Sequence, residues 1–166
     1  MHLGTFSKVL SPGIRLGWVV APRPVAEQIV LAKQGADLHT DALTQRAVVR
    51  FCADHDLDEH VLTLRAAYRE RRDAMLAALA DVMPAGTTWT RPEGGMFVWV
   101  TLPDGFEAQP LLAEALERRV AFVPGTAFHV DGGGARSLRL NFTNSPPERI
   151  REGVGRLAAA LERMAA

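Results

Sequence analysis

Apolar residues recur every three or four positions along two long stretches of the chain, and this spacing predicts two amphipathic helices. The first covers residues 58–83 and ends at Pro84 and Gly86, residue types that terminate helices. Its apolar face is formed by Val61, Leu64, Tyr68, Met75, Leu79 and Val82. The second begins at Ser145, because S-P-P-E has the form of a capping box made by Ser145 and Glu148. Its apolar face is formed by Ile150, Val154, Leu157 and Leu161.

Three shorter segments also have helical signals. A helix is predicted from Pro24, a residue type suited to a first turn, to about Lys33. Another is predicted to follow a Thr40 cap and to run to about Cys52. A third amphipathic helix is predicted over residues 107–119.

Short apolar runs bounded by turn residues predict the strands. The run at residues 16–21 is interpreted as a buried strand, and further strands are expected at residues 87–90, 96–102, 120–125 and 137–142. Alternation along the last of these predicts two faces. Leu138, Leu140 and Phe142 share one face, and Arg139, Asn141 and Thr143 share the other.

Length and composition narrow the class of protein. A chain of 166 residues forms one domain, or one small domain with part of another, and the element order places the division near residues 53–57. Nineteen basic and nineteen acidic residues cancel, which argues against a polybasic surface for nucleic acid or membrane. Cys52 is the single cysteine, so neither a disulfide framework nor a cysteine zinc site is expected. Without a membrane-length apolar run or a signal peptide, a soluble cytoplasmic protein is expected.

The start of the chain gathers groups that suit a phosphorylated aldehyde. Lys8 is one of two lysines, the other being Lys33. A neutral lysine amine condenses with carbonyl groups, and hydroxyls and guanidinium groups bind phosphate. Thr5 and Ser7 supply hydroxyls, and the Pro12-Gly13 turn brings Arg15 back toward Lys8. The alternative is an ordinary surface lysine in a polar loop.

The segment T-F-S-K-V-L-S-P-G-I-R-L-G-W resembles the cofactor-lysine segment of class I/II aminotransferases, the fold-type I pyridoxal-phosphate enzymes. The resemblance implies that Lys8 forms the Schiff base with pyridoxal 5'-phosphate. It also implies that Thr5 and Arg15 bind the phosphate, with Ser7 as a further contributor.

Four later segments extend the resemblance over essentially the whole chain, namely AKQGADLHT, TRPEGGMFVWV, VAFVPGTAF and GGGARSLRLNF. They are similar to the 2-aminoadipate aminotransferase branch. The implied fold class is α/β, the C-terminal part of a fold-type I transferase. Residues 1–55 would end the large cofactor-binding domain, and residues 56–166 would form the small α+β domain. Family features that lie upstream of the lysine are not found here, so the chain is expected to be a C-terminal fragment with weak cofactor binding and negligible activity.

Arg139 and Gly95 are the candidate substrate-binding residues. An arginine held on a rigid strand can grip a carboxylate with two parallel hydrogen bonds. The resemblance implies that Arg139 takes the α-carboxylate of the substrate; an edge-strand arginine pointing to water is the alternative. Gly94 and Gly95 would let the backbone approach the substrate, and the alternative is an ordinary turn into a strand.

The activity implied is amino-group transfer between an L-amino acid (2-aminoadipate, aromatic, branched or acidic) and a 2-oxo acid such as 2-oxoglutarate. The family also implies a homodimer of the full-length protein, with no nucleic-acid or membrane partner. Two alternatives remain: an aminotransferase-like effector domain of a winged-helix transcription regulator, and a decarboxylase or lyase on the same fold.

A cluster of potential metal ligands lies at residues 52–60, where the sequence is C-A-D-H-D-L-D-E-H. His55 and Glu59 are four residues apart, which would place them on one face of a helix. Acidic residues are also favoured at a helix N-terminus by its dipole. A solvated start of the long helix is therefore the expectation, and no metal site is assigned.

Overall fold

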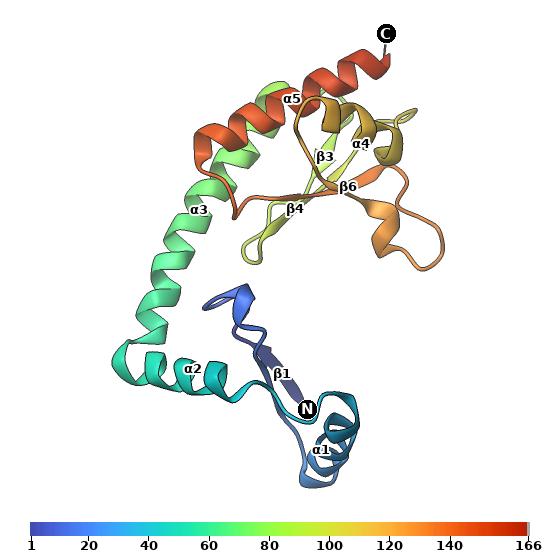
Figure 1. Ribbon diagram of the computed structural model, residues 1–166. Helices are drawn as coiled ribbons and strands as arrows, with labels where there is room; N and C mark the ends of the chain where they lie inside the picture. Colours follow the sequence, from blue (N-terminus) through green and yellow to red (C-terminus); the bar gives the residue numbers. More distant parts are fainter. Residues whose placement is uncertain (166) are drawn as a thin grey trace. The chain divides into compact units, whose positions relative to one another are not determined.

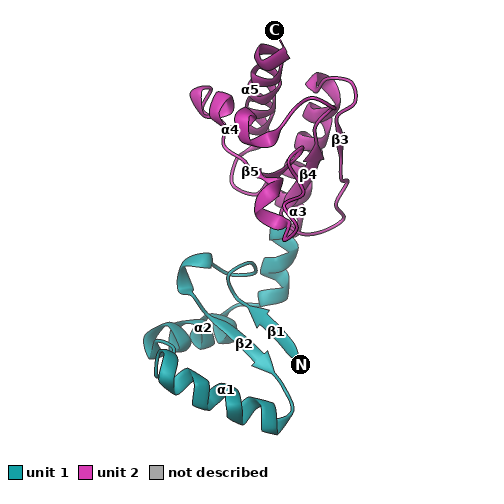
Figure 2. Cartoon of the chain, turned by 90° about the vertical axis from the view of Figure 1, so that its right-hand side faces the viewer, with its two compact units in different colours: residues 1–64 teal, residues 65–166 magenta. Residues whose placement is uncertain are grey.

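The computed structural model describes residues 1–165, and these residues form two compact units that divide after residue 64 (Figure 2). The division falls between Leu64 and Arg65, inside the helix α3 (Leu57–Val82). The break near residues 53–57, expected before or within the long helix, stays a prediction as a domain boundary. The functional assignment of the two parts as large and small domains stays a prediction.

The first unit begins with a two-stranded antiparallel ribbon of β1 (His2–Thr5) and β2 (Gly17–Val20). The sequence did not predict β1, whose four residues have no alternating pattern. The strand predicted at residues 16–21 is confirmed as β2, but the expectation that it is buried is wrong: Val20 is 63% exposed and Trp18 is 45% exposed. In a two-stranded ribbon, the apolar side chains of β2 have few neighbours to cover them.

Two helices and the start of α3 complete the first unit (Figure 1). The helix α1 (Arg23–Ala36) has proline in its first turn, as predicted, and continues three residues beyond Lys33. The helix α2 (Ala42–Asp54) is capped by Asp41 rather than by Thr40, because the Asp41 carboxylate accepts a 2.6 Å hydrogen bond from the Thr44 amide. Within residues 1–64, Val48 is the one buried residue, so this unit has almost no core of its own.

The second unit is built on a four-stranded antiparallel sheet in the order β3-β4-β6-β5. Its strands are β3 (Thr88–Trp89), β4 (Phe97–Thr101), β5 (Val123–Pro124) and β6 (Ser137–Asn141). Its helices are the later part of α3, α4 (Ala108–Glu117) and α5 (Pro147–Ala165). A short 3-10 turn, η2 (Gly125–Phe128), follows β5; the first unit contains a similar turn, η1 (Pro12–Ile14). The predicted positions of these elements are confirmed to within a few residues.

One face of the sheet carries the hydrophobic core. Val98 pairs with Leu140 and Val100 pairs with Leu138 across β4 and β6, and all four side chains are buried. Helices α3, α4 and α5 cover this face with Leu79, Leu111, Leu157 and Leu161, all nearly inaccessible to solvent. The predicted apolar face of the last helix is therefore confirmed in full, although α5 begins at Pro147 and not at Ser145.

One expectation about exposure is wrong in this unit. Val82 was placed on the apolar face of the long helix, but it is exposed, because the buried part of α3 ends near Leu79. Thr143, which follows β6, is a buried polar residue. Its amide and hydroxyl donate to the Asn141 side chain, and its carbonyl accepts a hydrogen bond from Arg71. No helix among the described residues is long and apolar enough to cross a membrane.

Candidate functional site

The lysine segment forms a closed loop between β1 and β2. Thr5 faces Gly17 at the end of the ribbon, and the Phe6 amide donates a 3.0 Å hydrogen bond to the Leu16 carbonyl. The amides of Leu10 and Ser11 both donate to the Phe6 carbonyl, at 2.8 and 3.1 Å. These bonds hold Lys8 in a tight turn whose two ends, near Thr5 and Leu16, lie side by side.

The two predicted phosphate ligands lie at this shared base. The Thr5 hydroxyl donates to the Leu16 carbonyl at 3.3 Å and accepts from the Ser7 amide at 3.1 Å. Arg15 adopts a left-handed backbone, with φ of 51°, immediately after the 3-10 turn η1. Its guanidinium donates to the Pro12 carbonyl at 3.0 Å. The ribbon register therefore brings Thr5 and Arg15 to the same end of the ribbon from positions ten apart in the sequence.

The residues of this loop remain open to a ligand. Thr5, Lys8 and Arg15 are exposed and Ser7 is half-buried. None of the ion pairs among the described residues involves Lys8 or Arg15. An amine, two hydroxyls and a guanidinium therefore line one loop, and this donor set fits an aldehyde that carries a phosphate.

Arg139 belongs to the second unit and lies on the sheet face opposite the core. Its cross-strand partners are Trp99 on β4 and Val123 on β5. Its guanidinium carbon lies over the Phe97 ring at 4.0 Å and over the Phe128 ring at 4.5 Å from the ring centroids. Its Nε is buried and has no hydrogen-bond acceptor among the described residues. The alternative of an arginine that simply points to water does not describe this environment.

Gly95 precedes β4 with φ of 81°, a left-handed conformation that side chains disfavour. A Cβ built on Gly95 or Gly94 would meet no described atom within 4 Å. The backbone conformation therefore accounts for glycine at position 95. Its proposed contact with substrate stays a prediction.

Sequence patterns did not single out Phe128, which contacts Arg139 from η2. The segment V-P-G-T-A-F predicts a turn after a strand, but the direction of the Phe128 side chain depends on how that turn folds back. The Trp99 ring meets Phe128 edge-on, with centroids 5.5 Å apart and an interplanar angle of 74°. Phe97, Trp99 and Phe128 thus form an aromatic surface around Arg139.

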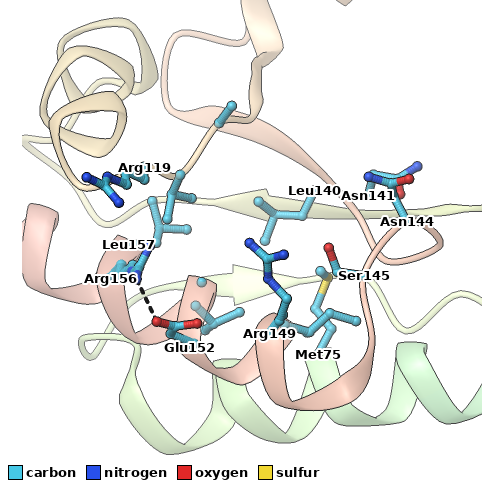
Figure 3. Close-up of a pocket in the computed structure, with 15 residues that line it drawn as sticks. Met75, Arg119, Leu140, Asn141, Asn144, Ser145, Arg149, Glu152, Arg156 and Leu157 are labelled. Carbon is cyan, nitrogen blue, oxygen red and sulfur yellow. Dashed lines mark hydrogen bonds and ion pairs between the residues drawn. The ribbon is translucent and has the colours of Figure 1, made fainter.

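A separate cavity of about 420 Å³ lies between α5 and the sheet in the second unit (Figure 3). Arg149 projects into it from α5, next to the ion pair of Arg156 with Glu152 at 2.6 Å. Leu140 also lines the cavity, and it lies on the core face of β6, opposite Arg139. None of the predicted site residues lines this cavity.

The potential metal ligands at residues 52–60 have other contacts. The Asp56 carboxylate accepts from the amides of Asp58 and Glu59, which makes it a cap for the start of α3. His55 and His60 both pack against the Phe51 ring, at 4.8 and 6.2 Å between centroids. The described residues contain no cluster of three potential metal ligands.

Comparison with known proteins gives the class of this chain. The family model "Aminotransferase class I and II" matches residues 1–157. The chain belongs to the class I and II aminotransferases, whose cofactor is pyridoxal phosphate. The Lys8 loop, with its amine, hydroxyls and guanidinium, fits that cofactor.

Individual relatives narrow the comparison. The chain is 47% identical to the 2-aminoadipate transaminase of Thermus thermophilus, over 98% of this chain and 41% of the relative. It is 44% identical to the aromatic-amino-acid aminotransferase 1 of Thermococcus litoralis, over 98% of this chain and 39% of the relative. The chain therefore spans about two fifths of the length of these curated relatives.

Solved structures of aminotransferases also match this chain. The α-aminoadipate aminotransferase LysN of Thermus thermophilus, complexed with N-(5'-phosphopyridoxyl)-L-leucine, matches with a TM-score of 0.93 and 47% identity, over 98% of this chain and 42% of that chain. The chain thus has part of a fold-type I aminotransferase fold. An uncharacterised HTH-type transcriptional regulator of Bacillus subtilis is also similar, at 31% identity over 99% of this chain and 34% of the regulator.

Proposed function

We propose that this chain provides the cofactor lysine and the substrate-carboxylate arginine of an aminotransferase. The observation that carries the proposal is the Lys8 loop: an exposed lysine lies in a loop whose two ends, held together by the ribbon, carry Thr5 and Arg15. Arg139 adds a second binding group, since its Nε lacks an acceptor among the described residues. Together these groups suit an aldehyde phosphate and a carboxylate.

Each residue has a distinct role in the proposal. Thr5, Ser7 and Arg15 hold the phosphate, and Arg139 binds the α-carboxylate of the amino acid with two parallel hydrogen bonds. Lys8 would hold the aldehyde group of the cofactor. Its neutral amine would also take the proton from the α-carbon of the amino acid and later return one, as general base and acid. Bound pyridoxal phosphate supplies the electron sink for this proton transfer.

The substrate class is part of the proposal. We propose an L-amino acid among 2-aminoadipate, aromatic, branched and acidic amino acids, with a 2-oxo acid such as 2-oxoglutarate as acceptor. The names of the relatives, a 2-aminoadipate transaminase and an aromatic-amino-acid aminotransferase, support the 2-aminoadipate and aromatic members of this range. A homodimer is proposed for the complete enzyme.

We also propose that the 166-residue chain alone does not transaminate. Its first unit buries one residue, and its Lys8 loop is exposed to water. Water in the site weakens electrostatic interactions with substrate and cofactor. Turnover by the chain alone, at a rate comparable to that of its relatives, would contradict this proposal.

A chimera tests the function directly. This chain would replace the corresponding part of the Thermus thermophilus 2-aminoadipate transaminase, which it matches at 47% identity. We expect the chimera to transaminate, Lys8→Ala to abolish turnover and Lys33→Ala to leave it unchanged. An active Lys8→Ala chimera would refute the assignment of the lysine.

The effector domain of a transcription regulator is the second candidate. The similarity to an HTH-type regulator over 99% of the chain favours it, although the identity of 31% is lower than for the aminotransferases. An effector domain needs to bind the cofactor but not to exchange amino groups. The chimera therefore separates the two: cofactor binding without turnover would favour the effector domain.

A further inference from the structure

The guanidinium of Arg139 lies against two phenyl rings. Its central carbon is 4.0 Å from the centroid of Phe97 and 4.5 Å from that of Phe128. Both distances are within the range in which a ring face attracts a cation. We call Phe97 and Phe128 the phenyl clamp.

The two rings reach Arg139 from different elements. Phe97 lies on β4, on the same sheet face as Trp99, the direct cross-strand partner of Arg139. Phe128 ends the 3-10 turn η2, which follows β5, the strand on the other side of β6. The edge-on contact with Trp99 supports the Phe128 ring in turn. The pairing of β6 with both β4 and β5 therefore brings the two rings of the clamp to Arg139.

The clamp leaves the hydrogen-bonding capacity of Arg139 unused. A ring face attracts the positive charge, but it does not replace an oxygen acceptor for the N–H groups. The Nε atom is buried and has no acceptor among the described residues, and no ion pair among them includes Arg139. A buried donor without an acceptor is unfavourable, so the site favours a ligand that supplies acceptor oxygens. A planar carboxylate fits a fork of N–H donors.

We propose that Phe97 and Phe128 are positioning residues, which hold the Arg139 guanidinium in one orientation so that it receives a carboxylate through paired N–H donors. This inference rests on the proposed role of Arg139 in binding substrate. It adds that binding depends on aromatic ring faces and not on apolar volume alone. It also explains why lysine would not serve at position 139: an ammonium offers no planar fork to be held by ring faces.

The test follows the Arg139 side chain by NMR in the 166-residue chain. The Nε–Hε resonance of Arg139, assigned by its loss in Arg139→Lys, is expected at high field because of the ring currents. Acetate is added as the carboxylate probe, with chloride at equal ionic strength as the control. We expect acetate, and not chloride, to shift this resonance. Arg136 provides an internal reference, since its Nε already donates to the Leu102 carbonyl at 3.3 Å.

Three variants distinguish an effect of the aromatic ring at position 128 from an effect of its apolar volume. Phe128→Leu keeps an apolar side chain at a position that is 45% exposed, so folding should be preserved. It should move the Arg139 resonance toward its ordinary field and raise the apparent Kd for acetate about three- to tenfold. Phe128→Tyr keeps the ring, so its Arg139 resonance and its Kd for acetate should be close to those of the unaltered chain. Phe106→Leu, at a phenylalanine that packs against the core instead of Arg139, should change neither.

The outcomes distinguish two failures. If acetate does not shift the Arg139 resonance in the unaltered chain, the carboxylate role of Arg139 is wrong, and with it the clamp proposal. If acetate binds equally well to the unaltered chain and to folded Phe128→Leu, the carboxylate role stands and the clamp is refuted. If Phe128→Leu is unfolded, judged by the loss of dispersed amide signals, Phe97→Leu is measured by the same criteria.

Discussion

The Nζ atom of Lys33 lies 2.8 Å from both carboxylate oxygens of Asp37, one turn further along the chain. Lys8, the other lysine, has no ion-pair partner among the described residues. The two lysines can therefore be compared directly, since one is paired with a carboxylate and the other is available beside the proposed phosphate ligands Thr5 and Arg15.

The first prediction concerns labelling by the cofactor. Pyridoxal phosphate followed by borohydride should label Lys8 in preference to Lys33, because in the proposed site Thr5 and Arg15 hold the phosphate beside Lys8. Peptide mapping by mass spectrometry identifies the labelled residue and separates it from the amine of Met1. Arg15→Ala should reduce the Lys8 label and leave the Lys33 label as it was. Equal labelling of both lysines would count against a cofactor site at Lys8.

The second prediction concerns Gly4, which faces Trp18 across the ribbon. A Cβ at Gly4 would lie 2.2 Å from two atoms of the Trp18 ring, so Gly4→Ala must displace the indole. We expect a shifted Trp18 indole N–H resonance and less cofactor label on Lys8, since the ribbon aligns the loop. Gly35→Ala is the control: it lies in α1 with no atom within 4 Å of the new Cβ, and should stabilise the helix by about 0.5–1 kcal/mol. An unmoved Trp18 signal in Gly4→Ala would show that the ribbon packing is not as described.

The third prediction concerns local stability. The second unit has a core and the first unit buries only Val48. Amides of the second unit, at Val98, Val100 and Leu140 for example, should therefore exchange slowly with solvent deuterium, whereas those of β1, β2 and α1 should exchange fast. Hydrogen-exchange mass spectrometry of the 166-residue chain measures this. Uniform protection along the chain would contradict the expectation.

The fourth prediction concerns the core. Leu79 on α3 is 0% exposed, and Leu79→Ala should lower the free energy of unfolding by about 2–5 kcal/mol. Leu116→Ala, on α4 and 54% exposed, should change it by less than about 0.5 kcal/mol. Urea unfolding followed by circular dichroism compares the two variants. Similar losses for both would mean that α3 does not pack as described.

The fifth prediction concerns pH. Hydrogen bonds from the side chain and the backbone amide of Thr44 lower the pKa of Asp41 below its ordinary value. The charged carboxylate therefore stabilises the start of α2 fully above the unfolded pKa of about 3.9, and this contribution is lost as the pH falls through the lowered folded value. An NMR titration of the Asp41 carboxyl carbon should give a midpoint below that of an unfolded peptide. Asp41→Asn keeps a capping side chain and should remove this titration from α2; a midpoint at or above the peptide value would exclude the cap.

Local patterns were sufficient for much of the second unit. The spacing of Ile150, Val154, Leu157 and Leu161 defines one face of a helix whatever the helix packs against, and all four are buried. Alternation along β6 likewise separates Arg139 from Leu138 and Leu140. The Lys8 segment was identified as a family feature from its residues, and the family is confirmed over residues 1–157. The roles of its individual residues stay predictions.

The sequence by itself determined the helical and strand periodicities, because these depend on neighbours within a few positions along the chain. Only the tertiary structure decided that β1 pairs with β2, that Val20 and Trp18 stay exposed, and that Phe128 reaches Arg139. Each of these depends on residues distant in sequence, through strand register or the path of a turn. The spacing of side chains along one segment does not determine which other segment pairs with it.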